Sequence, residues 1–184
     1  MRRPATPGQT VGPFFGYALP YGGGPDLVPA WRADAVRLHG QVLDGAGDPV
    51  PDALVELWQA DADGGVPRST GSLRRDGFTF TGWGRAATDA TGAYSFSTIV
   101  PGATSPGSAP FFAVTVFARG LLDRLFTRAY LPDDENALGV DPLLSSVPEA
   151  RRATLVATRD QSGYRFDIRL QGPGETVFLR YPRH

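Results

Sequence analysis

Turn-forming residues divide this chain into short stretches in which apolar and polar side chains alternate, and this pattern restricts the fold more than any other feature. The chain has 23 glycines and 17 prolines in 184 residues, which indicates many turns and few long helices. Between residues 36 and 42, Val36, Leu38, Gly40 and Val42 fill every second position. A period of two places them on one face of a half-buried strand.

Further candidate strands follow along the chain, some of them continuous apolar runs. The run 53–58 has little polar content, as in a strand covered on most of both faces. The turn residues 44–49 before it predict a hairpin or near-hairpin with 36–42. The unbroken apolar run 111–118 is predicted to be a central strand. Segment 121–130 fits a helix about as well as a strand, and we predict a strand at 125–131. The remaining predicted strands are 94–98, 154–158, 164–170 and 176–179, and short helical turns are predicted at 133–137, 141–144 and 148–152.

Short strands separated by turns at this spacing indicate an all-β fold, and specifically a β-sandwich. The length suits one domain over residues 1–184. Residues 1–30 are too rich in glycine and proline for a regular helix or a central strand, so we interpret them as an N-terminal arm. Because this arm carries Phe14, Phe15, Tyr17 and Tyr21, we expect it to pack across its own domain or a neighbouring subunit.

Charge and cysteine content argue against several classes of function. The formal net charge is −1, arginine supplies all 18 positive side chains, and no basic run suits nucleic acid. The absence of cysteine removes disulfides and thiolate metal sites. The polar start Met1–Ala5 is followed by no apolar signal core and no stretch long enough to cross a bilayer. We therefore expect a cytoplasmic protein with no nucleic-acid or membrane partner.

Few side chains could carry chemistry of their own. The two histidines are His39, on the polar face of its strand, and His184, the last residue. A nucleophilic triad needs a histidine beside a serine or cysteine, so we expect no triad, and we expect His39 to face solvent or to be paired. The acidic clusters lack the spacing of a calcium-binding loop and are interpreted as solvated turns: Asp61, Asp63, Asp133, Asp134 and Glu135.

Two places could line a ligand site. In the segment 10–14, a hydroxyl, a glycine and a rigid proline stand together, which suits the wall of a small cleft, although a plain turn that docks Phe14 would look the same. Arg119 directly follows the apolar run 111–118 and precedes Gly120. Its guanidinium could hold a carboxylate by paired hydrogen bonds, or it could form an ion pair within the chain.

Several segments, in this order, resemble the intradiol ring-cleaving dioxygenases, and among them the α subunits of protocatechuate 3,4-dioxygenases. The resemblance is spread from residue 6 to residue 179. Taken singly, the Gly-Gln-Val and Glu-Leu-Trp segments are weak, but the order of the segments and the two ends make the whole specific. The segments are Thr6–Phe14, His39–Val42, Val55–Asp61, Phe117–Gly120, Thr127–Tyr130, Tyr164–Gly172 and Glu175–Phe178.

The resemblance implies a β-sandwich in both an α-type and a β-type chain, with Fe(III) held by two tyrosines and two histidines of the β-type chain alone. The positions that match those four ligands here are Val66, Thr104, Phe111 and Ala113. Because a ferric ion binds phenolate, imidazole or carboxylate donors, none of these side chains could hold it. We therefore expect no metal on this chain, and a homologous β subunit that supplies the iron.

In the same family the α-type chain helps to line the substrate cavity through its N-terminal arm and the arginine of an Ala-Arg-Gly turn. These map onto Thr10, Gly12, Pro13, Phe14 and Arg119. Phe14 stands where the family often has tyrosine, which removes one hydroxyl contact. The activity that the resemblance implies for the complex is cleavage of protocatechuate by O2 to 3-carboxy-cis,cis-muconate, a step of aromatic catabolism in the β-ketoadipate pathway. The isolated chain is expected to be inactive.

Two other interpretations remain open from the sequence. A non-enzymatic transthyretin-like sandwich that binds a ligand could carry the segments 40–45 and 53–57, although the apolar arm and the C-terminal segments disfavour it. A single-chain intradiol enzyme with unusual iron ligands would show a tyrosinate-to-iron colour in the isolated chain, and we expect this chain to be colourless.

Overall fold

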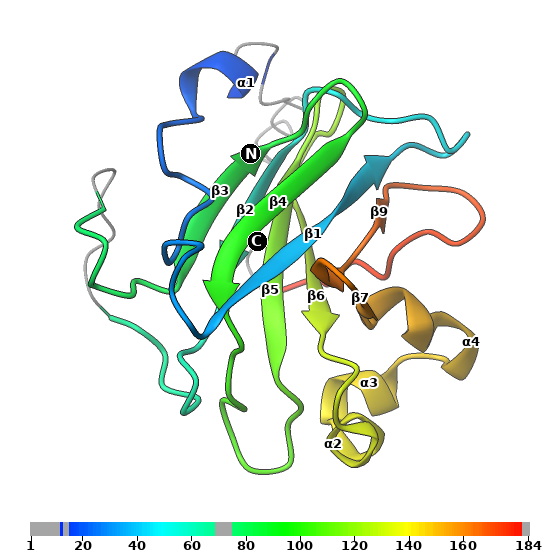
Figure 1. Ribbon diagram of the computed structural model, residues 1–184. Helices are drawn as coiled ribbons and strands as arrows, with labels where there is room; N and C mark the ends of the chain where they lie inside the picture. Colours follow the sequence, from blue (N-terminus) through cyan, green and yellow to red (C-terminus); the bar gives the residue numbers. More distant parts are fainter. Residues whose placement is uncertain (1–11, 13–14, 69–74, 182–184) are drawn as a thin grey trace, which may run out of the picture.

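The computed structural model describes residues 12, 15–68 and 75–181. Two β-sheets lie one behind the other, and short helices gather beside the lower end of strand β6 (Figure 1). The predicted all-β sandwich is confirmed. The elements are α1 (Phe15–Ala18), β1 (Ala35–Leu43), β2 (Leu54–Trp58), β3 (Trp83–Ala87), β4 (Ala93–Ile99), β5 (Phe111–Phe117), β6 (Leu125–Tyr130), α2 (Glu135–Val140), α3 (Pro142–Ser146), α4 (Glu149–Arg152), the 3₁₀ helix η1 (Ala153–Leu155), β7 (Thr158–Asp160), β8 (Gly163–Arg165) and β9 (Ile168–Arg169).

The first sheet has the order β4-β1-β8-β7, with β9 also paired to β1. Strand β1 runs antiparallel to β4 and parallel to β8 and β9. As predicted from its alternation, Leu38, Gly40 and Val42 are buried, whereas Val36 is half-buried. One side of this sheet therefore faces the core and the other faces solvent.

The second sheet has the order β3-β2-β5-β6, with every pair antiparallel. Strand β5 lies between β2 and β6, which confirms the predicted central strand. Apolar side chains of both sheets meet between the layers and form the main core. Its largest fully buried members include Leu38, Phe96, Leu57, Phe112 and Ile168.

The predicted hairpin between residues 36–42 and 53–58 is wrong. Strand β1 belongs to the first sheet and β2 to the second, so the turn between them carries the chain from one layer to the other. Strand β3 was not predicted at all. It pairs with β2 from Leu54 opposite Ala87 to Trp58 opposite Trp83. The three-strand ending is only partly correct, because Ala153–Leu155 is a 3₁₀ helix and segment 176–179 forms an isolated bridge at Leu179 instead of a strand.

Segment 24–28 of the arm closes one open side of the sandwich. The amide of Arg85 in β3 donates to the carbonyl of Gly24 at 2.9 Å, and the amide of Ser97 in β4 donates to the carbonyl of Pro25 at 3.0 Å. The amide of Leu27 returns a bond to the carbonyl of Ser97 at 2.8 Å. One stretch of backbone thus covers the edge strands of both sheets, and this part of the arm packs on its own domain.

The predicted continuous strand 164–170 is broken where it crosses β1. Strands β8 and β9 pair with β1 on either side of the break, and the amide of Phe166 donates to the carbonyl of His39 at 2.7 Å. The amide of Gln41 then bonds the carboxylate of Asp167 at 3.0 Å instead of a backbone carbonyl. The hydroxyl of Tyr94 donates to the carbonyl of Phe166 at 2.5 Å, which fixes the break from the core side.

We expect the protein to lose stability above pH 10 because two buried phenols resist ionisation. Burial raises the pKa of Tyr130 to about 12 and raises the pKa of Tyr94 further. Below pH 10 both residues are neutral in the folded and unfolded states. Between pH 10 and 12 the unfolded chain loses these protons and the folded chain keeps them, so the free energy of unfolding falls by about 1.4 kcal/mol per pH unit for each tyrosine.

Urea denaturation at pH 9, 10 and 11 measures this slope. The variant Tyr130→Phe should show a shallower fall of the unfolding free energy with pH than the wild-type protein. An unchanged slope in Tyr130→Phe would contradict the assignment.

Candidate functional site

Of the arm residues predicted to line a cavity, only Gly12 is among the described residues. Thr10, Pro13 and Phe14 lie outside them. Gly12 has a φ of +75°, a conformation that glycine adopts without strain. Helix α1, which begins three residues later, lies toward the upper end of the sandwich in Figure 1.

Arg119 stands at the corner of the turn between β5 and β6. The amide of Leu121 donates to the carbonyl of Ala118 at 3.2 Å, and Gly120 has a φ of +92°, which a β-turn accepts at its third position when glycine is there. The turn directs the guanidinium outward. Nη2 of Arg119 lies 3.0 Å from Oδ2 of Asp52, with 66% of the Arg119 side chain and 33% of the Asp52 side chain exposed.

This ion pair is a consequence of the strand register. Leu54 of β2 lies opposite Phe117 of β5. Two residues further along each antiparallel strand, Asp52 and Arg119 face each other with their side chains on the same side, as cross-strand partners do. Sequence reasoning found Arg119 but did not find Asp52, because the pairing of these two strands was not predicted.

A hollow of about 410 Å³ surrounds the pair. Both polar and apolar residues line it. An arginine beside apolar walls can bind a carboxylate that is attached to an apolar ring. Among the lining residues are Val50, Pro51, Asp52, Arg119, Leu121 and Leu170.

The four positions that the sequence resemblance predicts to match iron ligands belong to the other end of the second sheet. Val66 and Thr104 are exposed in loops, and Phe111 and Ala113 lie at the start of β5. The two loops touch, since the amide of Gly102 donates to the carbonyl of Asp61 at 2.7 Å.

The residues at these positions do not fit a ferric ion. Their methyl, hydroxyl and phenyl groups are not the donors that Fe(III) takes, and no three His, Cys, Asp or Glu side chains gather anywhere in the described part of the chain. The guanidinium carbon of Arg128 lies 3.8 Å from the ring centre of Phe111, and Arg128 pairs across the strands with Ala113. A fixed positive charge at this place further opposes a metal cation.

The arginine turn and the vacant metal positions are separated by the length of β5. Arg119 is the sixth residue after Ala113, a separation of roughly 20 Å in an extended strand. In Figure 1 the loop before β5 lies at the bottom and the turn after it at the top. Arg119 therefore cannot share one small ligand with the positions at Phe111 and Ala113 of the same chain.

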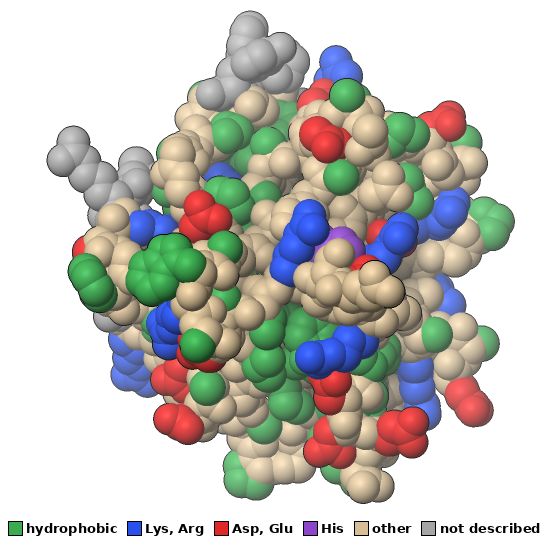
Figure 2. Space-filling view, viewed as in Figure 1, with side chains coloured by type: hydrophobic (Ala, Val, Ile, Leu, Met, Phe, Trp, Pro, Cys, Tyr) green, Lys and Arg blue, Asp and Glu red, His purple; other side chains and the backbone are tan. Residues whose placement is uncertain are grey.

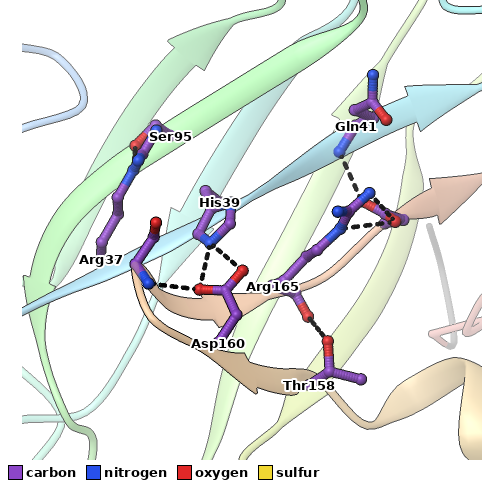
Figure 3. A network of polar contacts seen from close by, with 9 residues as sticks. Arg37, His39, Gln41, Ser95, Thr158, Asp160 and Arg165 are labelled. Carbon is purple, nitrogen blue, oxygen red and sulfur yellow. Dashed lines mark hydrogen bonds and ion pairs between the residues drawn. The ribbon is translucent and has the colours of Figure 1, made fainter.

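His39 belongs to a polar network on the solvent face of the first sheet (Figure 3). Its Nε2 lies 3.2 Å from Oδ2 of Asp160, and its side chain is 17% exposed. Of the two expectations for His39, solvent-facing or paired, the structure shows the paired one. The backbone amide of Ser162, with a smaller contribution from His39, lowers the pKa of Asp160. Nε of Arg37 donates to Oγ of Ser95 at 2.7 Å. Figure 2 shows the histidine set between arginine side chains on this face.

The acidic clusters serve local structure, as interpreted from their spacing. Oδ1 of Asp61 accepts the amide of Gly65 at 2.7 Å, and Asp134 caps α2. Asp133 pairs with Arg159 at 2.9 Å.

No described helix is long and apolar enough to cross a membrane.

Comparison with known proteins identifies the family. A family model described as Dioxygenase matches residues 32–109. The chain is 45% identical to the protocatechuate 3,4-dioxygenase alpha chain of Burkholderia cepacia, over 95% of this chain and 96% of that one. It is 37% identical to the protocatechuate 3,4-dioxygenase beta chain of Burkholderia cepacia, over 80% of this chain and 68% of that one.

Among solved structures, the dioxygenase domain of a dioxygenase carbohydrate-binding protein fusion from Streptomyces sp. SirexAA-E superposes with a TM-score of 0.59 at 26% identity, covering 91% of this chain and 99% of that one. The similarity in fold and the sequence identity over nearly the whole length indicate the same family. The chain belongs to the intradiol dioxygenase family, among its protocatechuate 3,4-dioxygenase alpha chains.

Proposed function

We propose that this chain is the metal-free α subunit of a protocatechuate 3,4-dioxygenase and that a homologous β subunit holds the iron. The complex would cleave protocatechuate with O2 to 3-carboxy-cis,cis-muconate. One observation carries the proposal: the chain matches an alpha chain over 95% of its length, yet carries Val66, Thr104, Phe111 and Ala113 where the family's iron ligands would stand. The non-enzymatic sandwich has no comparable support.

The role proposed for this chain is to bind and orient the substrate. Protocatechuate carries a carboxylate on an aromatic ring, and Arg119 could attract and hold that carboxylate by charge-assisted hydrogen bonds. The arm residues Thr10, Gly12, Pro13 and Phe14 would supply further cavity wall. Since Arg119 lies roughly 20 Å of strand away from this chain's own vacant metal positions, it would act on a site whose metal belongs to the partner. The iron of that partner would supply the oxygen chemistry.

Co-expression with a β-type chain tests the proposal. We expect the purified chain alone to be colourless, to hold substoichiometric iron and to consume no O2 with protocatechuate. The co-purified complex should contain iron and consume one O2 per substrate cleaved. Stoichiometric iron together with ring cleavage by the lone chain would reject the proposal and support the single-chain enzyme.

Replacing Arg119 by leucine in the complex should raise KM for protocatechuate by about 10- to 100-fold, because a charge-assisted hydrogen bond to the carboxylate is lost. Iron content should not change, because the substitution lies on the metal-free chain. The matched control is Arg37→Leu, which removes the same charge from the outer face of the other sheet and should leave KM unchanged. Steady-state O2 uptake and iron analysis provide both readouts, and an unchanged KM in Arg119→Leu would reject this role.

A further inference from the structure

We infer that Asp52 is a positioning residue for substrate recognition, which holds Arg119 in the orientation that receives the substrate carboxylate. This inference rests on the proposed function of Arg119. It adds a second residue, from the turn before β2, to the substrate-recognition site. The geometry behind it is the 3.0 Å contact between Oδ2 of Asp52 and Nη2 of Arg119.

The pair leaves most of the guanidinium available. Within the described part of the chain, the contact with Asp52 involves only Nη2 of Arg119, so N–H groups on Nε or on Nη1 can still donate to a second carboxylate. Asp52 is the more buried partner and sits on a short proline-containing turn directly before β2. Asp52 is therefore the member of the pair that its surroundings restrict more, and its contact restricts the more exposed Arg119 side chain.

Two opposing effects decide whether Asp52 strengthens or weakens the binding of the substrate. The negative charge of Asp52 repels an anionic substrate bound on the far side of the guanidinium, about 6–7 Å away, which in water costs about threefold in affinity. Restricting an exposed arginine before the substrate binds raises the affinity by up to about thirtyfold, since the arginine no longer loses rotamer freedom on binding. Positioning outweighs repulsion, so removing the carboxylate should weaken recognition of the substrate.

The test is Asp52→Asn in the co-purified α–β complex, with protocatechuate and unsubstituted catechol as substrates. We expect KM for protocatechuate to rise by about 3- to 10-fold with kcat unchanged. KM for catechol should stay within about twofold, since catechol carries no carboxylate for Arg119 to bind. The variant Asp52→Glu, which keeps the charge, should recover most of the wild-type KM. A loss of folding alone would affect both substrates and would not be recovered by glutamate.

The matched control is Asp48→Asn, which removes a negative charge from the same connection between β1 and β2. Asp48 is exposed and makes no side-chain contact with Arg119, so KM for protocatechuate should not change. In the double variant with Arg119→Leu, Asp52→Asn should have no additional effect, because a positioning residue acts only through the group that it positions.

The outcomes separate the inference from the function beneath it. If Arg119→Leu raises KM for protocatechuate and Asp52→Asn does not, or if Asp52→Asn lowers that KM, the positioning role is wrong while the proposed function survives. If Arg119→Leu itself changes nothing, the substrate-binding role of Arg119 fails, and the role of Asp52 fails with it. An equal rise in KM for both substrates would also overturn the inference.

Discussion

Replacing Asp141 with alanine is expected to lower the free energy of unfolding by about 3–5 kcal/mol. Asp141 is 1% exposed and accepts hydrogen bonds from three structural regions at once. Its Oδ2 accepts the amide of Ala109 at 3.0 Å, and its Oδ1 accepts the hydroxyl of Tyr130 and the amides of Leu143 and Leu144, each at 3.0 Å. Alanine leaves these buried donors without an acceptor and removes the cap of α3.

Chemical denaturation measures this loss, and Asp134→Ala is its matched control. Asp134 also caps a short helix, through the amide of Ala137 at 2.9 Å, but it is exposed. Losing this cap should cost only about 1 kcal/mol. Equal losses at the two positions would show that Asp141 acts as a cap alone and does not join the helical region to β6.

Gly40→Ala is expected to destabilise the protein by about 4 kcal/mol or more, because the added carbon has no space. A Cβ on Gly40 would lie 2.0 Å from the carbonyl oxygen and 2.6 Å from the carbonyl carbon of Phe166. These are backbone atoms at the break between β8 and β9. Two hydrogen bonds hold them: the amide of Phe166 donates to the carbonyl of His39, and the hydroxyl of Tyr94 donates to the carbonyl of Phe166. Relief would require β8 and β9 to separate from β1.

Thermal and urea unfolding of Gly139→Ala supply the comparison. Gly139 lies in α2, and a Cβ there would meet nothing within 4 Å. This substitution should be neutral or should stabilise the protein by up to about 1 kcal/mol, because alanine favours helix. If Gly40→Ala were as mild as Gly139→Ala, the close approach of Phe166 to β1 would be wrong.

The pattern of apolar residues along the chain predicted most strands because it reports a local property, namely which side chains face the core. Alternation predicted β1 and β4, and continuous apolar runs predicted β2 and β5, but neither pattern could tell which strand pairs with which. The predicted hairpin failed for this reason. A turn after β1 was visible in the sequence, whereas the step from one sheet to the other depends on contacts with β4 and β5 that are distant in sequence.

Strand β3 shows where local signals end. Its sequence, Trp83–Ala87, contains a glycine and two alanines, which have little intrinsic preference for strands. It is a strand because β2 pairs with it and segment 24–28 covers its other side. A Cβ on Gly84 would lie 2.4 Å from Cδ1 of Leu27, so a larger residue there would displace the end of the Leu27 side chain. None of this can be deduced before the tertiary structure is known.

In the candidate site, too, some features are visible in the sequence and others depend on the tertiary structure. Arg119 could be singled out as a candidate, because an arginine after an unbroken apolar run and before a glycine is conspicuous in the sequence. The contacts of Asp52 and Arg128 could not be predicted, because they depend on the register between β2, β5 and β6. The lack of iron donors at Phe111 and Ala113 was readable from the sequence, but the guanidinium that lies over Phe111 was not.

The covered edges of the sandwich determine how this chain can join another. Segment 24–28 bonds to β3 and β4, and Leu179 and Val156 form bridges to β6. These strands are therefore protected against β-augmentation, in which a foreign strand extends a sheet through main-chain hydrogen bonds. A second chain that docks there must recognise side chains, so the choice of partner at these edges is encoded in shape and charge and is open to change by single substitutions.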